Sequence, residues 1–97
     1  MNALAYDMSS NAEKTPGVVF GRFMLPDMSE HACQVIDLDK TGATFLTADV
    51  PPMNMAIVAY LEDLGRVEVT SSEVVQGGFK VVYAYTGARL ERLQQRI

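Results

Sequence analysis

The chain has 97 residues and a formal net charge of −4, with 48% hydrophobic and 21% charged residues. This length fits one domain of ordinary size, and the composition argues against intrinsic disorder in the body of the chain. The acidic balance argues against a nucleic-acid polymer as partner, because binding to its backbone requires a basic field that neutralises phosphates.

Cysteine content and hydropathy bear on the compartment. Cys33 is the one cysteine, so no intrachain disulfide can form, as is common in a reducing cytoplasm. No apolar run approaches the ~20 residues that cross a bilayer. The first ten residues lack the basic and apolar regions of a signal peptide. We therefore expect a cytoplasmic protein without a membrane span.

The chain begins with a polar segment, residues 1–15, that has no sustained hydrophobic period. We predict that it forms a flexible N-terminal arm. Pro16 and Gly17 then mark a boundary, because this pair is typical of turns and loops. The predicted domain therefore covers residues 16–97.

Six short apolar or alternating segments follow, separated by turn-forming residues. They are Val18–Leu25, Ala32–Leu38, Ala43–Ala48, Met55–Glu62, Arg66–Thr70 and Phe79–Tyr85. The fourth segment also fits a helical period, but its short length and flanking turns favour a strand. Gly21 in the first segment is a candidate β-bulge. Strands at this spacing favour a closed or nearly closed antiparallel barrel, which leaves no exposed sheet edge.

The end of the chain changes period. Leu90, Leu93 and Ile97 recur at spacings of three and four among charged residues, and Thr86 precedes them as a candidate N-cap. This pattern predicts a short amphipathic helix whose cationic end suits the helix dipole. The predicted fold is therefore all-β: a small six-stranded antiparallel barrel with a short C-terminal α-helix.

Candidates for catalysis are few. His31 and Cys33 are two positions apart and could form a nucleophilic pair on one face of a strand. A small core cysteine and a turn histidine are the stronger interpretation. Asp37 and Asp39 could act as an acid/base pair or bind a cation, but their place in a turn that ends at Gly42 favours a structural role. We therefore expect no enzymatic activity.

Glycines and aromatic residues near the end of the barrel also have two interpretations. Gly77 and Gly78 lie between two predicted strands, which favours a hairpin turn over a phosphate-binding loop. The alternating side chains of Phe79, Val81, Tyr83 and Tyr85 could stack on bases, but their period of two is typical of a core face. We predict a hairpin and a core strand.

In their order and spacing, four stretches of the chain resemble a PilZ domain of the small stand-alone type found in alphaproteobacteria. They are Gly21–Leu25, Cys33–Ala43, Val58–Leu61 with Leu64–Glu68, and Gly77–Phe79 with Arg89–Leu93. The resemblance runs from about Val18 to the C-terminus. It implies a barrel with a closing helix and a place in cyclic di-GMP signalling.

The family binds cyclic di-GMP partly through an Arg-x-x-x-Arg segment ahead of the first strand. Guanidinium groups suit this role because they bind phosphate and guanine edges bidentately. Here the two positions fall near Ser10 and Lys14, and no arginine precedes Arg22. Only Lys14 keeps a positive charge, and an ammonium group does not replace the guanidinium fork.

The family's second binding element is an Asp/Asn-x-Ser-x-x-Gly turn. Asp37 and Gly42 match this motif, but Asp39 stands where the family has serine. A carboxylate beside an anionic dinucleotide adds repulsion. The resemblance therefore implies a nucleotide site with a degenerate motif.

The leading hypothesis is a PilZ-like regulatory module whose cyclic di-GMP binding is weakened or lost and which acts through a protein partner. One alternative is a working cyclic di-GMP receptor, with Lys14, Arg22 and Asp37 holding the ligand beside Asp39 and Gly42. Another is a generic small barrel, of the OB or SH3 sort, that binds proteins. No cofactor is expected besides cyclic di-GMP as a ligand, and the sequence leaves the oligomeric state open.

Overall fold

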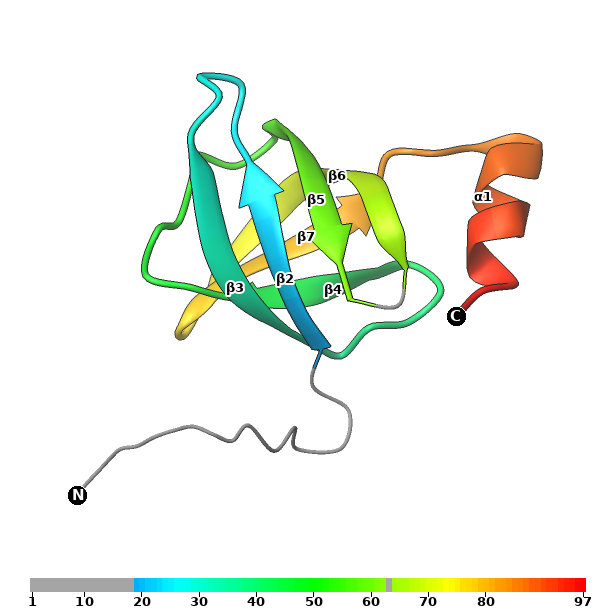
Figure 1. Cartoon of the computed structure of the whole chain (residues 1–97), viewed down its shortest axis with the longest axis horizontal. Coiled ribbons are helices and arrows are strands. Elements are labelled where there is room, and N and C mark those ends of the chain that lie inside the picture. The colour runs from blue at the N-terminus through cyan, green and yellow to red at the C-terminus, as the bar shows by residue number, and fades with distance from the viewer. Residues whose placement is uncertain (1–18, 63) are drawn as a thin grey trace.

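A closed barrel of six antiparallel strands forms the body of the chain in the computed structural model, which describes residues 19–62 and 64–97. The strands are β2 (Val19–Met24), β3 (Glu30–Ile36), β4 (Gly42–Leu46), β5 (Ala56–Leu61), β6 (Gly65–Val75) and β7 (Gly78–Tyr83). Their order around the barrel is β2-β3-β4-β7-β6-β5, and pairing of β5 with β2 closes it (Figure 1). The predicted all-β barrel is confirmed. The predicted arm, residues 1–15, and the domain start at residue 16 lie outside the described residues.

The barrel interior is filled by alternate side chains of every strand. At its centre Phe23, Phe45 and Phe79 are each 0% exposed, and their ring centroids lie 5.5 to 5.9 Å apart. Burial of one such side chain stabilises a fold by roughly 1.5–3 kcal/mol, and tilted or edge-to-face ring pairs add to this. Val81 and Tyr83 continue this inner face along β7, so the prediction of a core strand is confirmed up to Tyr83. Tyr85 lies beyond the end of the strand and is only partly buried against the core.

The ambiguous fourth segment is strand β5. Ile57, Ala59 and Leu61 point into the core, and the residues between them are partly or fully exposed, which is the period of two that a strand requires. The hairpin predicted at Gly77 is also present, because β6 and β7 pair up to Val75 and Gly78, and Gly77 adopts a φ of +85°.

The bulge predicted at Gly21 was wrong. Strand β2 keeps a continuous register through Gly21 with both β3 and β5. A Cβ at this position would lie 2.8 Å from Leu61 Cδ2 and 3.0 Å from Tyr60 O, so the glycine serves close packing of β2 on β5. The register shift that the strands do contain lies in β6 between Ser71 and Glu73.

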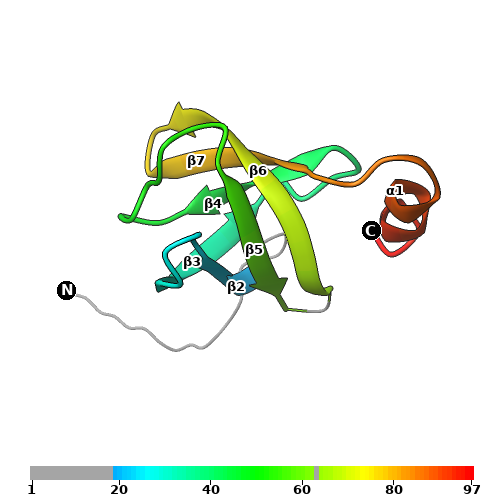
Figure 2. The same ribbon diagram turned by 90° about the horizontal axis from the view of Figure 1, so that it is seen from above.

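The helix α1 (Gly87–Gln94) follows β7 and packs beside the barrel (Figures 1 and 2). Leu93 is buried in the core and Leu90 packs partly against it, as the predicted amphipathic period requires. Thr86 is the N-cap residue, although its side chain makes no capping hydrogen bond. No helix in the described part of the chain is long and apolar enough to cross a membrane.

Two side chains at the end of α1 bind turns of the barrel. Gln94 donates a hydrogen bond from Nε2 to the Lys40 carbonyl oxygen at 2.8 Å. Arg96 donates one from a guanidinium nitrogen to the Leu64 carbonyl oxygen at 2.6 Å. The helix therefore joins the β3–β4 turn to the β5–β6 turn.

Candidate functional site

The turn that matches the PilZ motif lies between β3 and β4. Asp37 adopts a φ of +54°, a left-handed conformation that aspartate tolerates better than most residues. The Asp39 amide donates to the Gly42 carbonyl oxygen at 2.9 Å, which closes the turn. The hydrogen bonds of the Asp39 side chain are made within the segment itself, as is typical of aspartate in turns.

Asp39 Oδ1 accepts three hydrogen bonds inside this turn. The donors are the Thr41 amide at 2.8 Å, the Thr41 hydroxyl at 2.8 Å and the Gly42 amide at 3.0 Å. The hydrogen bond from the Thr41 backbone amide contributes most, and together the three hydrogen bonds lower the pKa of Asp39 below its usual value of 3.8. The turn interpretation of Asp39 is confirmed.

Gly42 and Tyr83 fix the turn against β7. A Cβ at Gly42 would collide with the Val81 carbonyl oxygen, so only glycine allows β4 to approach β7 this closely. The hydroxyl of Tyr83 donates to the Asp39 carbonyl oxygen at 2.7 Å. Burial, with a smaller contribution from the Asp39 charge, raises the pKa of Tyr83 to about 12, so the hydroxyl stays a donor at neutral pH.

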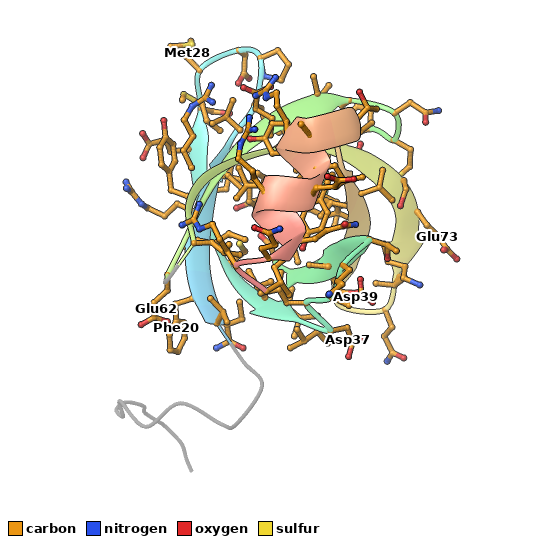
Figure 3. The ribbon with its side chains drawn as sticks, turned by 90° about the vertical axis from the view of Figure 1, so that its right-hand side faces the viewer. Phe20, Met28, Asp37, Asp39, Glu62 and Glu73 are labelled. Atoms are coloured by element: carbon orange, nitrogen blue, oxygen red, sulfur yellow. The ribbon has the colours of Figure 1, made fainter. Side chains whose placement is uncertain are left out.

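A pocket of about 270 Å³ opens beside this turn and is called here the motif pocket. Its charged lining residues are Asp37, Asp39, Glu73 and Lys80. Three carboxylates against one ammonium group give a net charge of −2. Figure 3 shows Asp37 and Asp39 together below α1, with Glu73 further round the same side. The pocket therefore carries the wrong sign for an anionic ligand.

Of the two predicted cationic ligands, the structure describes Arg22, and Arg22 does not line the motif pocket. Arg22 lies on β2, and one of its guanidinium nitrogens is 3.1 Å from Glu30 Oε1. Its guanidinium carbon also lies 5.8 Å from the ring centroid of Tyr60, on the outer face of the barrel. Arg22 is therefore a salt-bridged strand residue. Lys14 lies outside the described residues.

A second pocket, of about 320 Å³, lies between α1 and the barrel and is called here the arginine pocket. It is lined by Arg66, Tyr85, Arg89, Arg92, Leu93 and Arg96. Arg89 and Arg92 lie on α1, Arg96 lies just after its C-cap residue, and Arg66 comes from β6. The chain contains five arginines in total, so this pocket gathers all but Arg22.

The arginine pocket has few internal partners for its charges. Arg66 binds Glu68 Oε2 at 2.8 Å, and this bond is the main cause of the lowered pKa of Glu68. The guanidinium carbon of Arg89 lies 4.5 Å from the ring centroid of Tyr85, a cation–π geometry. Within residues 19–62 and 64–97 no hydrogen bond, ion pair or ring contact is found for Arg92.

Ser29, His31 and Asp49 form a hydrogen-bonded series on the opposite hairpin. Ser29 Oγ lies 2.9 Å from His31 Nε2, and His31 Nδ1 lies 3.1 Å from Asp49 Oδ2. This is the order of groups in a serine hydrolase triad. His31 belongs to strand β3, so its predicted place in a turn was wrong.

The bonding of Ser29 gives this series a structural role. The Ser29 hydroxyl donates to Asp27 Oδ1 at 2.6 Å, and this bond is the main cause of the lowered pKa of Asp27. The hydroxyl proton of Ser29 therefore points to Asp27, so His31 is not placed to remove it as a general base. Cys33 is equally inert, because burial raises the pKa of its thiol to about 11. The series ties the β2–β3 hairpin to the segment after β4.

An apolar groove of about 450 Å³ runs over the outer face of β2, β5 and β6. Its apolar walls are formed by Met24, Leu25, Pro26, Met28, Ala56 and Val58. Met28 is 73% exposed and holds a φ of +74°, a conformation that costs a bulky side chain about 1–3 kcal/mol. Figure 3 shows Met28 at the tip of the hairpin, far from Asp37 and Asp39.

Comparison of the chain with models of protein families, with curated proteins and with solved structures found no match. In the described part of the chain, no group of three or more histidine, cysteine, aspartate or glutamate side chains could hold a metal ion. The function must therefore be argued from the geometry of the pockets and from the sequence motif.

The sequence located the motif turn but missed the arginine pocket and the Ser29 series. The sequence shows Arg89, Arg92 and Arg96 at spacings of three and four, but a cationic end of the helix is explained by the helix dipole without any ligand. Nothing local links Arg66 to that helix, or Asp49 to His31. These contacts depend on how distant segments pack, which short-range patterns do not specify.

Proposed function

We propose that this chain is a PilZ-like regulatory module of cyclic di-GMP signalling in the cytoplasm, with weakened or lost nucleotide binding, that acts through contacts with a protein partner. The observation that carries the proposal is the motif pocket. A turn forms from Asp37 to Gly42, where the resemblance implies one, but the pocket beside it has a lining with a net charge of −2.

Repulsion at the motif pocket is hard to remove. Asp39 is ionised at neutral pH, because three donors in its own turn hold its pKa low. Glu73 adds a further carboxylate, and Lys80 is the pocket's one cation. Loss of a charge-assisted contact to an anionic ligand costs about 2–5 kcal/mol, and 1.4 kcal/mol is about tenfold in affinity. Two missing arginines and an added carboxylate are therefore enough to abolish micromolar binding.

The barrel's closing helix also supports the proposal. The alternative of a generic small barrel predicts a different strand connection or no helix packed at the barrel. Instead α1 buries Leu93 in the core and bonds to two turns, at Lys40 and Leu64. This arrangement is what the resemblance to PilZ domains leads one to expect.

Action through a protein partner is supported by the apolar groove. Met28 lies at its rim and is exposed. Its backbone adopts a left-handed conformation, which does not require a methionine. Such strain is retained where it serves a function, and methionine is enriched at the centres of protein interfaces. Met24 and Val58 continue the apolar surface along the outer face of the sheet.

The test is calorimetric titration of the full chain with cyclic di-GMP at low ionic strength. The proposal expects no binding that depends on the motif pocket. The matched variants are Asp37→Ala and Asp39→Ser, of which the second restores the residue that the family motif carries. Tight binding of one or two nucleotides that Asp37→Ala abolishes would overturn the loss of the site. Tight binding that Asp37→Ala leaves unchanged would overturn the loss of nucleotide binding by the chain, and only the degeneracy of the motif pocket would stand.

A further inference from the structure

The arginine pocket has no role in the proposed function, and its charge is unusual for this chain. The whole sequence has a net charge of −4, yet four of its five arginines meet in one pocket of about 320 Å³. They come from β6 and from α1, which are separated in sequence by β7. The gathering therefore arises from the fold and not from a basic stretch of sequence.

The arrangement of charges on α1 is unfavourable by itself. Arg89 and Arg92 are three apart on α1, and Arg96 follows Arg92 by four residues in the turn after the helix, so Arg92 has a like charge on each side. The helix dipole favours Arg92 in the last turn, but it disfavours Arg89 in the first turn, where α1 has no acidic residue. A helix selected only for stability would place carboxylates among these positions.

Contacts within the protein satisfy only part of the donor capacity of the pocket. Each guanidinium has five N–H donors. Arg66 donates one hydrogen bond to Glu68 and Arg96 donates one to the Leu64 carbonyl oxygen. Four guanidinium groups line the pocket, and within residues 19–62 and 64–97 the ion pair of Arg66 with Glu68 is the one that they form. Several donors are therefore directed to solvent or to a ligand.

The chemistry of the pocket matches a phosphate group. A phosphoryl group carries up to two negative charges and three acceptor oxygens, and guanidinium forks bind it with paired hydrogen bonds. The side chains of Tyr85 and Leu93 provide an apolar floor that lowers competition from water. A volume of about 320 Å³ lies at the lower end of small-molecule sites, which span roughly 300–1,000 Å³.

We propose that the arginine pocket, formed by α1 and β6, binds a small ligand through its phosphate group. The phosphate can belong to inorganic phosphate or pyrophosphate, or to a nucleotide. Arg89 and Arg92 engage it from the helix and Arg66 from the strand. Because Arg66 also lines the apolar groove, an anion that draws it away from Glu68 changes the charge at the edge of that groove. The proposal does not depend on the assignment to cyclic di-GMP signalling.

The experiment is calorimetric titration of the full chain with phosphate, pyrophosphate, GMP and cyclic di-GMP at low ionic strength, where charges are least screened. The key variant is Arg92→Gln, because this side chain has no partner among the described residues and its loss leaves the fold intact. Removal of one charged donor is expected to weaken binding roughly ten- to a hundredfold. The matched control is Arg22→Gln, which removes the arginine on the outer face of β2 and is expected to leave the affinity unchanged.

Arg92→Lys separates paired hydrogen bonding from simple charge. Lysine keeps the positive charge but loses the planar fork, so a built phosphate site predicts a clear loss of affinity in this variant. Equal affinities of the wild type and Arg92→Lys, or equal losses in Arg92→Gln and Arg22→Gln, would overturn the proposal in favour of diffuse attraction. Absence of heat with all four ligands at millimolar concentration would also overturn it.

The ligands themselves identify the source of the phosphate. Similar affinities for pyrophosphate and the nucleotides show that the pocket recognises the phosphate alone. Tighter binding of a nucleotide shows that its base adds contacts. Cyclic di-GMP binding that Arg92→Gln removes and Asp37→Ala does not would support this pocket while leaving the degenerate motif pocket as proposed. The two proposals therefore fail separately.

Discussion

The motif pocket and the arginine pocket are connected through one helix but differ in how their charges are used. Lys40, next to Asp39, accepts a hydrogen bond from Gln94 of α1, and the same helix carries Arg89 and Arg92. At the motif pocket, three donors from the turn saturate Asp39 Oδ1. At the arginine pocket, Arg92 has no such partner within residues 19–62 and 64–97.

This difference separates structural charge from charge that is available for binding. A polar group whose hydrogen bonds are made within its own turn specifies the fold and has little capacity left for a ligand. A cluster of like charges with unused donors costs stability, and such a cost is retained where a ligand repays it. The hydrogen bonds of the motif turn therefore serve the fold, whereas the arginine pocket keeps donors for the ligand that we propose.

The largest expected effect tests the rigidity of the motif turn. Gly42→Ala places a Cβ against the Val81 carbonyl oxygen in the β4–β7 ladder, which forces these strands apart. We expect the free energy of unfolding to fall by about 3 kcal/mol or more, or the protein not to fold. Chemical denaturation measures this change.

The matched control is Gly87→Ala at the start of α1. Gly87 also has a positive φ, of +59°, but no atom lies within 4 Å of a Cβ built there. The cost should be only that of the left-handed backbone, about 1–2 kcal/mol. Equal losses in the two variants would mean that backbone conformation, and not close packing on β7, is what Gly42 provides.

The sequence predicts a pocket well when the contacts that form it join residues close together in the chain. The turn at Asp37 to Gly42 was predictable, because its bonds join residues two or three positions apart and depend on side chains that favour turns. The strands were also predictable from their period. Their ends were less so, since β6 continues to Val75 through a register shift that no local pattern marks.

The arginine pocket illustrates what the sequence could not supply. The helical period of Leu90 and Leu93 specifies that α1 packs on the barrel, but not which strand lies beside its charged face. That depends on the extended link after β7 and on the bonds of Gln94 and Arg96 to distant turns. Convergence of Arg66 with the helix is therefore a property of the packed structure.

An effect of intermediate size tests whether Asp39 is structural. Asp39→Ala removes the acceptor of three hydrogen bonds and should lower the free energy of unfolding, whereas Asp39→Asn keeps an oxygen in the same place and should lower it less. Thermal and chemical unfolding of the two variants beside the wild type measures the difference. Equal stability of Asp39→Ala and wild type would show that the turn does not need this side chain.

The pH dependence of the same pair follows from the lowered pKa of Asp39. Because its pKa in the folded state lies below 3.8, the unfolded chain takes up the proton first as the pH falls. The charged carboxylate therefore stabilises the fold above pH 3.8, and this contribution is lost as the pH drops through the lower folded value. The advantage of wild type over Asp39→Asn should be present at about pH 6 and should shrink as the pH falls below 3.8. An advantage that is unchanged at the lower pH contradicts the assignment.

The smallest expected effect concerns Arg92 and sharpens the contrast with Asp39. In Arg92→Gln the helix loses a favourable interaction with its dipole but also two unfavourable pairings, with Arg89 and Arg96. Each amounts to a few tenths of a kcal/mol, so the unfolding free energy should change by less than about 0.5 kcal/mol in phosphate-free buffer. Added salt should favour the wild type over the variant, because screening relieves repulsion that the variant lacks. A loss above about 1 kcal/mol would make Arg92 a structural residue like Asp39, and its donors would then not be available to a ligand.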